Sequence, residues 1–129
     1  MKKVLAFGTF DRLHRGHIYY LKQAKKYGHL TVLIARDLTV KNVKGHFPEN
    51  NEQKRLAQVK KLGIADNLIL SNYTDKYTVL DYIKPDIICL GYDQKFFIDN
   101  LVEELEKRRL YNTEIVRMKE YKGEKEPIK

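Results

Sequence analysis

Short apolar runs alternate with longer amphipathic stretches along the chain. Five runs rich in valine, isoleucine and leucine cover residues 4–7, 30–35, 67–70, 86–90 and 113–118. Brief, nearly continuous apolar runs are typical of strands that are buried on both faces of a sheet. We therefore expect five buried strands.

The stretch after the first run predicts a helix over residues 16–27. Ile18, Leu21 and Ala24 recur there at helical spacing. Gly28 follows at a place where a glycine commonly ends a helix.

Apolar residues at helical spacing predict three further helices. One polar stretch lacks this pattern. The expected helices cover residues 56–62, 79–83 and 96–109. Gly63 closes the first of them. The polar stretch 36–51 carries Gly45 and Pro48, which interrupt any periodicity, so we expect a loop there.

Strands that alternate with helices imply β-α-β crossovers and a parallel sheet. The pattern predicts one α/β domain over residues 1–129, built on a doubly wound parallel sheet of about five strands. Residues 119–129 are polar and are expected to form a tail without regular structure. Ligands of such folds bind beyond the carboxyl ends of the strands.

Composition narrows the classes of protein that fit. Hydrophobic residues make up 43% of the chain and charged residues 33%, which is typical of a globular domain. Cys89 is the only cysteine, which excludes an internal disulfide and suits a reducing compartment. With no signal peptide or membrane span evident, we expect a soluble cytoplasmic protein.

The net charge of +8 fits a solvated basic surface, a membrane surface, a nucleic acid or small polyphosphates as partners. The basic residues are spread along the chain, and the nine tyrosines do not interleave with them in a stacking pattern. We therefore expect neither nucleic acid nor membrane as a partner.

The chemistry is concentrated in residues 8–17, between the first expected strand and the first expected helix. A helix that starts near Gly16 directs free backbone N–H groups at this segment, which favours bound phosphate. His14 and His17 lie three residues apart and can both donate hydrogen bonds to one phosphate. A zinc site and a purely structural pair that caps the helix are the alternatives.

Here the sequence resembles a known family. His14-Arg15-Gly16-His17 matches the HxGH signature of the cytidylyltransferase-like nucleotidyltransferases, and Gly8-Thr9-Phe10-Asp11 matches their GTFD lead-in. The resemblance extends to about Met118 and implies a Rossmann-like sheet.

The resemblance implies roles for the residues of this segment. In the family both signature histidines contact the triphosphate and stabilise the transition state, and these roles carry to His14 and His17. The rest of the segment lies along the nucleotide, and the matching positions are Thr9, Phe10, Arg15 and Gly16.

The implied reaction is an in-line attack of an acceptor phosphate on the α-phosphorus, with Mg²⁺ bridging phosphate oxygens. Asp11 is the one candidate ligand for that metal. Lys44 and Arg55 match a family lysine and arginine that grip the acceptor phosphate or the leaving pyrophosphate. Solvated surface positions are the alternative for both.

Two later segments also match family positions that reach the nucleotide. Asp93 is the polar member of residues 90–94, and an N-cap of the helix expected over residues 96–109 is its alternative role. Tyr121 matches a tyrosine that contacts the nucleotide beyond the last strand.

Within the family, residues 35–37, 90–94 and 115–117 look most like archaeal FAD synthases, which transfer AMP from ATP to FMN. Glycerol-3-phosphate cytidylyltransferase, which uses CTP, and sugar-phosphate nucleotidyltransferases are the alternatives. A nucleotide-binding sensor without turnover is the non-enzyme alternative, and a homodimer is plausible for the family.

Relatives also carry a serine- or threonine-rich segment after the last strand, which contacts the phosphates. Residues 119–129 contain neither residue type. Either the sequence continues beyond Lys129, or the protein lacks that contact.

Overall fold

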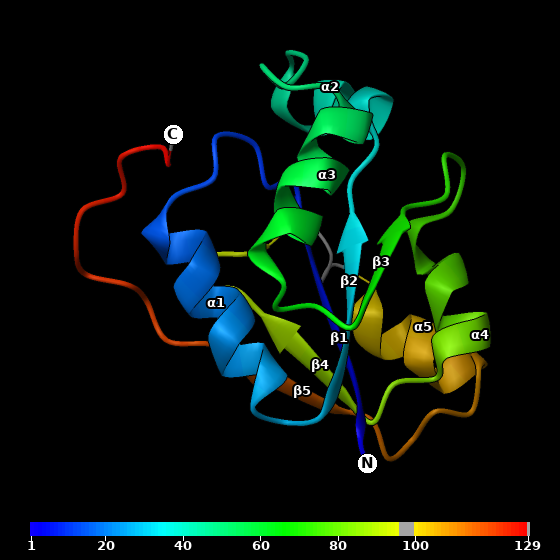
Figure 1. The fold of residues 1–129 in the computed structure, drawn as a ribbon. Coiled ribbons are helices and arrows are strands. Elements are labelled where there is room, and N and C mark those ends of the chain that lie inside the picture. The colour runs from blue at the N-terminus through cyan, green and yellow to red at the C-terminus, as the bar shows by residue number, and fades with distance from the viewer. Residues whose placement is uncertain (96–99, 129) are drawn as a thin grey trace.

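The computed structural model describes residues 1–95 and 100–128, and it contains one parallel sheet (Figure 1). The strand order is β3-β2-β1-β4-β5, and every pairing is parallel. The strands are β1 (Lys3–Gly8), β2 (His29–Ile34), β3 (Asn67–Leu70), β4 (Ile87–Leu90) and β5 (Glu114–Arg117). All five expected strands are confirmed, each within two residues of its predicted bounds. The expected burial is confirmed for β1, β2 and β4 and is wrong for the edge strands β3 and β5, whose residues are half-buried or exposed.

Helices cover both faces of this sheet (Figure 1). One face packs against α1 (Arg15–Lys25) and α3 (Glu52–Leu62), with α2 (Asp37–Lys44) between β2 and α3 in the chain. The other face packs against the 3₁₀ turn η1 (Lys76–Thr78), α4 (Val79–Ile83) and α5 (Leu101–Lys107). The predicted doubly wound α/β architecture is therefore confirmed.

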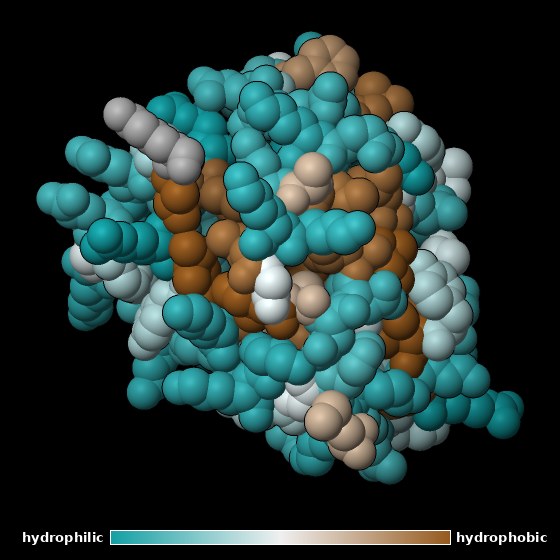
Figure 2. All heavy atoms as spheres, in the orientation of Figure 1, coloured by the Kyte–Doolittle hydropathy of each residue, from teal (hydrophilic) through white to brown (hydrophobic). Residues whose placement is uncertain are grey.

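Alternation along β1 explains why its sequence is apolar throughout. Val4 and Ala6 pack into the core on the α1 and α3 side, whereas Leu5 and Phe7 pack into the core on the α4 and α5 side. A strand with a hydrophobic core on each face has no polar face to present. The face seen in Figure 2 is mostly hydrophilic, and apolar side chains show between the polar ones over its centre.

The sheet opens a crevice where its winding direction changes. Connections from β1 lead through one face to β2, whereas β4 lies on the other side of β1 and is reached through the opposite face. Tyr20 of α1 ties the two strands together at this point. Its hydroxyl accepts a hydrogen bond from Phe7 N at 3.3 Å and donates one to Cys89 O at 2.5 Å. The crevice lies beyond this tie, at the carboxyl ends of β1 and β4.

One predicted loop contains a helix. We expected no regular structure over residues 36–51, and this prediction is wrong for α2 (Asp37–Lys44). Val40 is the one buried residue of α2, so the helix lacks the repeated apolar spacing that reveals longer helices. Gly45, which we took as an interruption, is its left-handed C-cap, and Gly45 N donates to Lys41 O at 2.8 Å.

Gly28 has a different role from the predicted helix end. The C-cap of α1 is Lys26, in right-handed helical conformation. Gly28 has φ 155°, and a Cβ there would collide with the carbonyl oxygen of Lys2. The close approach lets His29 N donate to Lys2 O at 2.9 Å, which starts the pairing of β1 with β2. Gly63, by contrast, is confirmed as the left-handed C-cap of α3.

The last predicted helix is confirmed only in part. Its described portion is α5, which begins at Leu101. Residues 96–99 lie outside the described residues.

We expect Gly28→Ala to lower the free energy of unfolding by about 2–4 kcal/mol, because it combines an unfavourable φ with a backbone collision. Gly63→Ala is the matched control. It also has positive φ, at 70°, but its Cβ meets no atom within 4 Å, so we expect a loss of about 1 kcal/mol. Urea denaturation of both variants measures the difference, and equal losses would contradict the collision.

Candidate active site

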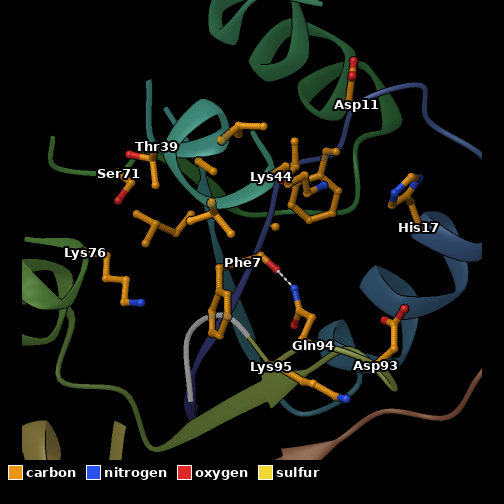
Figure 3. A pocket seen from close by; sticks show the side chains of 17 residues that line it. Phe7, Asp11, His17, Thr39, Lys44, Ser71, Lys76, Asp93, Gln94 and Lys95 are labelled. Carbon is orange, nitrogen blue, oxygen red and sulfur yellow. Dashed lines mark hydrogen bonds between the residues drawn. The ribbon is translucent and has the colours of Figure 1, made fainter. Parts of the chain in front are cut away.

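Two cavities meet at the carboxyl edge of β1 and β4. The larger has a volume of about 400 Å³ and the smaller about 190 Å³. Three residues line both cavities: His17, Asp93 and Gln94. Figure 3 shows these side chains on one side of the larger cavity, with Thr39, Ser71 and Lys76 across from them.

The histidine pair is built into the first turn of α1. His14 is the N-cap residue, and its Nδ1 accepts a hydrogen bond from Gly16 N at 3.0 Å. The Nδ1 of His17 accepts one from His14 N at 3.1 Å, which completes a reciprocal capping box. The two rings stack, with centroids 3.9 Å apart and planes inclined by 28°.

These hydrogen bonds select one tautomer of each ring. A neutral imidazole that accepts at Nδ1 carries its proton on Nε2, so both Nε2–H groups become donors. Burial, the neighbouring His14 and Lys44 lower the pKa of His17 to about 4, so its ring is neutral at pH 7. Burial and Lys125 also lower the pKa of His14. The pair therefore caps the helix through Nδ1 and presents N–H donors through Nε2.

Gly16 is required by the His14 ring. A Cβ at Gly16 would lie 2.7 Å from Cε1 of His14, which is too close for the observed cap. Phe10 packs against the ring of His17. It is only 2% exposed, and its ring centroid lies 5.7 Å from that of His17.

Arg55 is a structural clamp. Its side chain is fully buried, and it donates from Nε to Asn50 O at 2.9 Å and from Nη1 to Thr9 O at 2.7 Å. Its Nη2 donates to Asp37 Oδ1 at 2.7 Å. The guanidinium is engaged inside the protein and lines neither cavity, so its expected phosphate contact stays a prediction that these contacts do not favour.

Asp11 also serves the loops. Its carboxylate accepts hydrogen bonds from Glu49 N at 2.8 Å, Asn50 N at 3.0 Å and Asn50 Nδ2 at 2.9 Å. Burial acts to raise the pKa of Asp11, but these hydrogen bonds outweigh it and the pKa falls. Within residues 1–95 and 100–128, no three His, Cys, Asp or Glu side chains gather to hold a metal ion.

The loop after β4 is held by two residues that sequence reasoning missed. Gln94 donates from Nε2 to Phe7 O at 2.7 Å and accepts at Oε1 from Gly91 N at 2.6 Å, so it bridges the ends of β1 and β4 (Figure 3). Arg117 donates to Gly91 O at 2.8 Å and to Gln94 O at 3.0 Å. In the sequence, only Gly91 after a buried strand indicated this turn. The residues that hold the turn, Phe7 and Arg117, belong to other strands.

The same turn places Asp93, which is exposed and lines both cavities. It is not the N-cap of α5, as the alternative reading suggested. That position belongs to Asn100, whose side chain makes no capping hydrogen bond.

The other candidate residues divide between the cavities. Thr9, Phe10 and Lys44 line the larger one, whereas Gly16 and Tyr121 line the smaller. Arg15 is exposed in the first turn of α1, outside the lining of both described cavities. Sequence reasoning missed Lys119 and Lys125, which belong to the tail and line the smaller cavity.

The family model described as Cytidylyltransferase-like matches residues 5–126. The chain belongs to this family. A FAD synthase from Methanosarcina barkeri is 49% identical over 113 residues, which cover 85% of this chain and 78% of that protein. A FAD synthase from Methanohalophilus mahii is 46% identical over 121 residues, covering 92% and 82%. This family member is a nucleotidyltransferase.

A solved structure shares the fold at similar identity. The crystal structure of the lipopolysaccharide core biosynthesis protein from Thermoplasma volcanium GSS1 matches with a TM-score of 0.83 and 44% identity, covering 92% of this chain and 96% of that one. Among the described residues, no helix has the length and apolar character that crossing a membrane requires.

We expect His17 to titrate near pH 4 in the free protein, with its proton on Nε2 when neutral. Because the unfolded state takes up this proton near pH 6.5, the folded protein loses stability as the pH falls from about 6.5 towards 4. Two-dimensional ¹H–¹⁵N NMR of the imidazole reports both the pKa and the tautomer. A proton on Nδ1 of the neutral ring would contradict the capping geometry.

Proposed function

We propose that the protein transfers AMP from ATP to FMN, which produces FAD and pyrophosphate. The relatives named FAD synthase support this assignment, as does the cavity beside the histidine pair. The observation that carries the choice of acceptor is that this cavity of about 400 Å³ has an apolar floor.

The apolar floor suits a flavin ring. It is formed by Phe7, Leu33, Ala35, Val40 and Val43. A flat, largely apolar isoalloxazine gains free energy by burying its faces against such a surface, whereas glycerol phosphate or a sugar phosphate has little apolar area to bury.

Polar groups surround this floor. Thr39 and Ser71 offer hydroxyls to the edge of the ring, and Lys44 offers a cation to the FMN phosphate. We assign the acceptor to this larger cavity on these grounds.

The smaller cavity suits the nucleotide. Gly16 and His14 bring the N-terminus of α1 to its phosphates, and the turn at Gly91 and Asp93 lies beside Tyr121 for the nucleoside. His17 lines both cavities, so we assign the α-phosphate to the junction between them. Thr9, Phe10 and Arg15 remain proposed contacts, on the strength of the family segment.

The reaction needs no protein nucleophile. An oxygen of the FMN phosphate attacks the α-phosphorus and forms the new P–O bond, while the bond from that phosphorus to the β-bridging oxygen breaks and pyrophosphate leaves. The Nε2–H groups of His14 and His17 donate to the oxygens on which negative charge builds up. A divalent cation such as Mg²⁺ would neutralise part of the triphosphate charge. Asp11 remains its candidate ligand, although its carboxylate already accepts hydrogen bonds from Glu49 N and Asn50 N.

Two consequences for the cell follow from this proposal. We place the protein in the cytoplasm, where ATP and FMN are available. We expect no nucleic acid as a partner, and the homodimer that the family suggests stays a prediction.

A second candidate is transfer of a nucleoside monophosphate to a sugar phosphate. The name of the Thermoplasma volcanium structure, a lipopolysaccharide core biosynthesis protein, favours it at 44% identity. A purely polar acceptor leaves the apolar floor uncovered, so we rank this candidate second.

A product assay separates these candidates. The protein is incubated with Mg²⁺ and labelled ATP or CTP, and with FMN, glycerol 3-phosphate or a heptose phosphate. We expect labelled FAD from ATP and FMN, and little product from the other pairs. Product from a heptose phosphate without FAD would replace the first candidate with the second.

His14→Asn tests the catalytic pair without removing the helix cap. Asparagine is a good N-cap residue, so we expect a free energy of unfolding within about 0.5 kcal/mol of wild type. It lacks the Nε2–H donor, so kcat/KM for FAD formation should fall about a hundredfold to a thousandfold. Near-normal turnover in a folded variant would contradict the assigned role.

A further inference from the structure

The tail after β5 returns along α1 to the histidine turn (Figure 1). Near its beginning, Lys119 N donates to Gln23 Oε1 at 2.9 Å, and Gln23 Nε2 donates to Lys119 O at 3.1 Å. Near its end, Ile128 N donates to Leu13 O at 2.7 Å. These contacts hold the segment between them beside the smaller cavity, although it contains no helix or strand.

Lys125 is a tail residue that lies beside the start of α1. Its Cε is 3.7 Å from the position that a Cβ would take on Gly16, and it lines the smaller cavity together with His14. Its Nζ donates to Tyr92 Oη at 3.3 Å and lies 4.9 Å from the centre of the Tyr92 ring. Tyr92 lines the same cavity and therefore holds the ammonium group beside it.

The ion pair of Lys125 leaves its charge available. Glu120 is its acidic neighbour, at 3.8 Å from Nζ, and the side chains are 35% and 42% exposed. A long, partly exposed pair of this kind contributes little free energy. A polyphosphate, which carries several negative charges, competes well for such a lysine.

We propose that Lys125 binds the β- and γ-phosphates of the nucleoside triphosphate and then the leaving pyrophosphate. This inference rests on the proposed function. In an in-line displacement, the leaving group departs on the side opposite the attacking oxygen. With the acceptor in the larger cavity and the α-phosphate beside His17, that side is the smaller cavity, where Lys125 lies.

The histidine turn itself carries little positive charge to bind a polyphosphate. His14 and His17 are held neutral, and the N-terminus of α1 contributes only about half a positive charge. Lys125 adds a full charge beside the same turn. Its proximity also lowers the pKa of His14, which gives an independent readout of its position.

The test compares Lys125→Ala with Lys125→Arg, and with Lys122→Ala as the control. Lys122 is an exposed lysine of the same tail, so its removal changes the net charge equally. Calorimetric titration with a non-hydrolysable ATP analogue, with pyrophosphate and with AMP measures each affinity.

We expect Lys125→Ala to lower the affinity for the ATP analogue and for pyrophosphate about tenfold to a hundredfold. This is the contribution of one charge-assisted hydrogen bond, about 1.5–3 kcal/mol. AMP, which lacks the β- and γ-phosphates, should bind within twofold of wild type. Lys125→Arg should restore most of the affinity. Lys122→Ala should leave the affinity for each ligand within twofold of wild type.

Wild-type affinity for the ATP analogue in Lys125→Ala would overturn the proposal, as would an equal loss for AMP. NMR titration of His14 in the same variant should show a higher pKa, and an unchanged pKa would show that the tail lies elsewhere in solution. A wild-type protein that binds ATP but makes no FAD would instead refute the proposed function and leave the phosphate contact of Lys125 standing.

Discussion

Two hydrogen bonds from backbone N–H groups to imidazole nitrogens, at the start of α1, are the interaction on which the site depends. Gly16 N and His14 N each donate to an Nδ1 atom, so each ring is oriented and its tautomer chosen by the helix itself. An aspartate cap leaves no donor for a ligand, since a carboxylate only accepts hydrogen bonds. An imidazole that accepts at Nδ1 keeps its Nε2–H group as a donor. The two capping histidines therefore offer two donors to a ligand.

The loops around this turn are held by polar side chains that each make several hydrogen bonds, and of these side chains Arg55 is fully buried. Arg55 joins the loop after β1 to α2 and to the loop before α3, and Asp11 adds three further hydrogen bonds to that loop. Gln94 and Arg117 do the same for the turn after β4. Segments distant in the sequence thus form walls that keep their positions around His17. This arrangement accounts for two cavities that share one histidine.

The position of the cavities follows from the winding of the sheet. Helices leave the central strands towards opposite faces, and the crevice beyond the carboxyl ends of β1 and β4 is left for a ligand. The two cavities open on either side of this gap, which suits a reaction between two substrates that approach one phosphorus from opposite sides. The net charge of +8 fits partners that all carry phosphate.

The sequence alone determined the positions of the five strands and of the chemical segment 8–17, because apolar runs and a glycine-flanked histidine pair are local patterns. It did not show that β3 and β5 are half-buried or exposed, since that follows from their places at the edges of the sheet. It failed for α2, whose only buried residue is Val40. It also did not show the internal contacts of Arg55, which depend on partners in three other segments. The contacts of Gln94 with Phe7 and of Lys125 with Tyr92 could not be predicted either, since the partners lie tens of residues away in the chain. Only the tertiary structure decided these roles. A basic residue can lie exposed beside a ligand or be buried among protein hydrogen-bond acceptors, and the packing around it determines which.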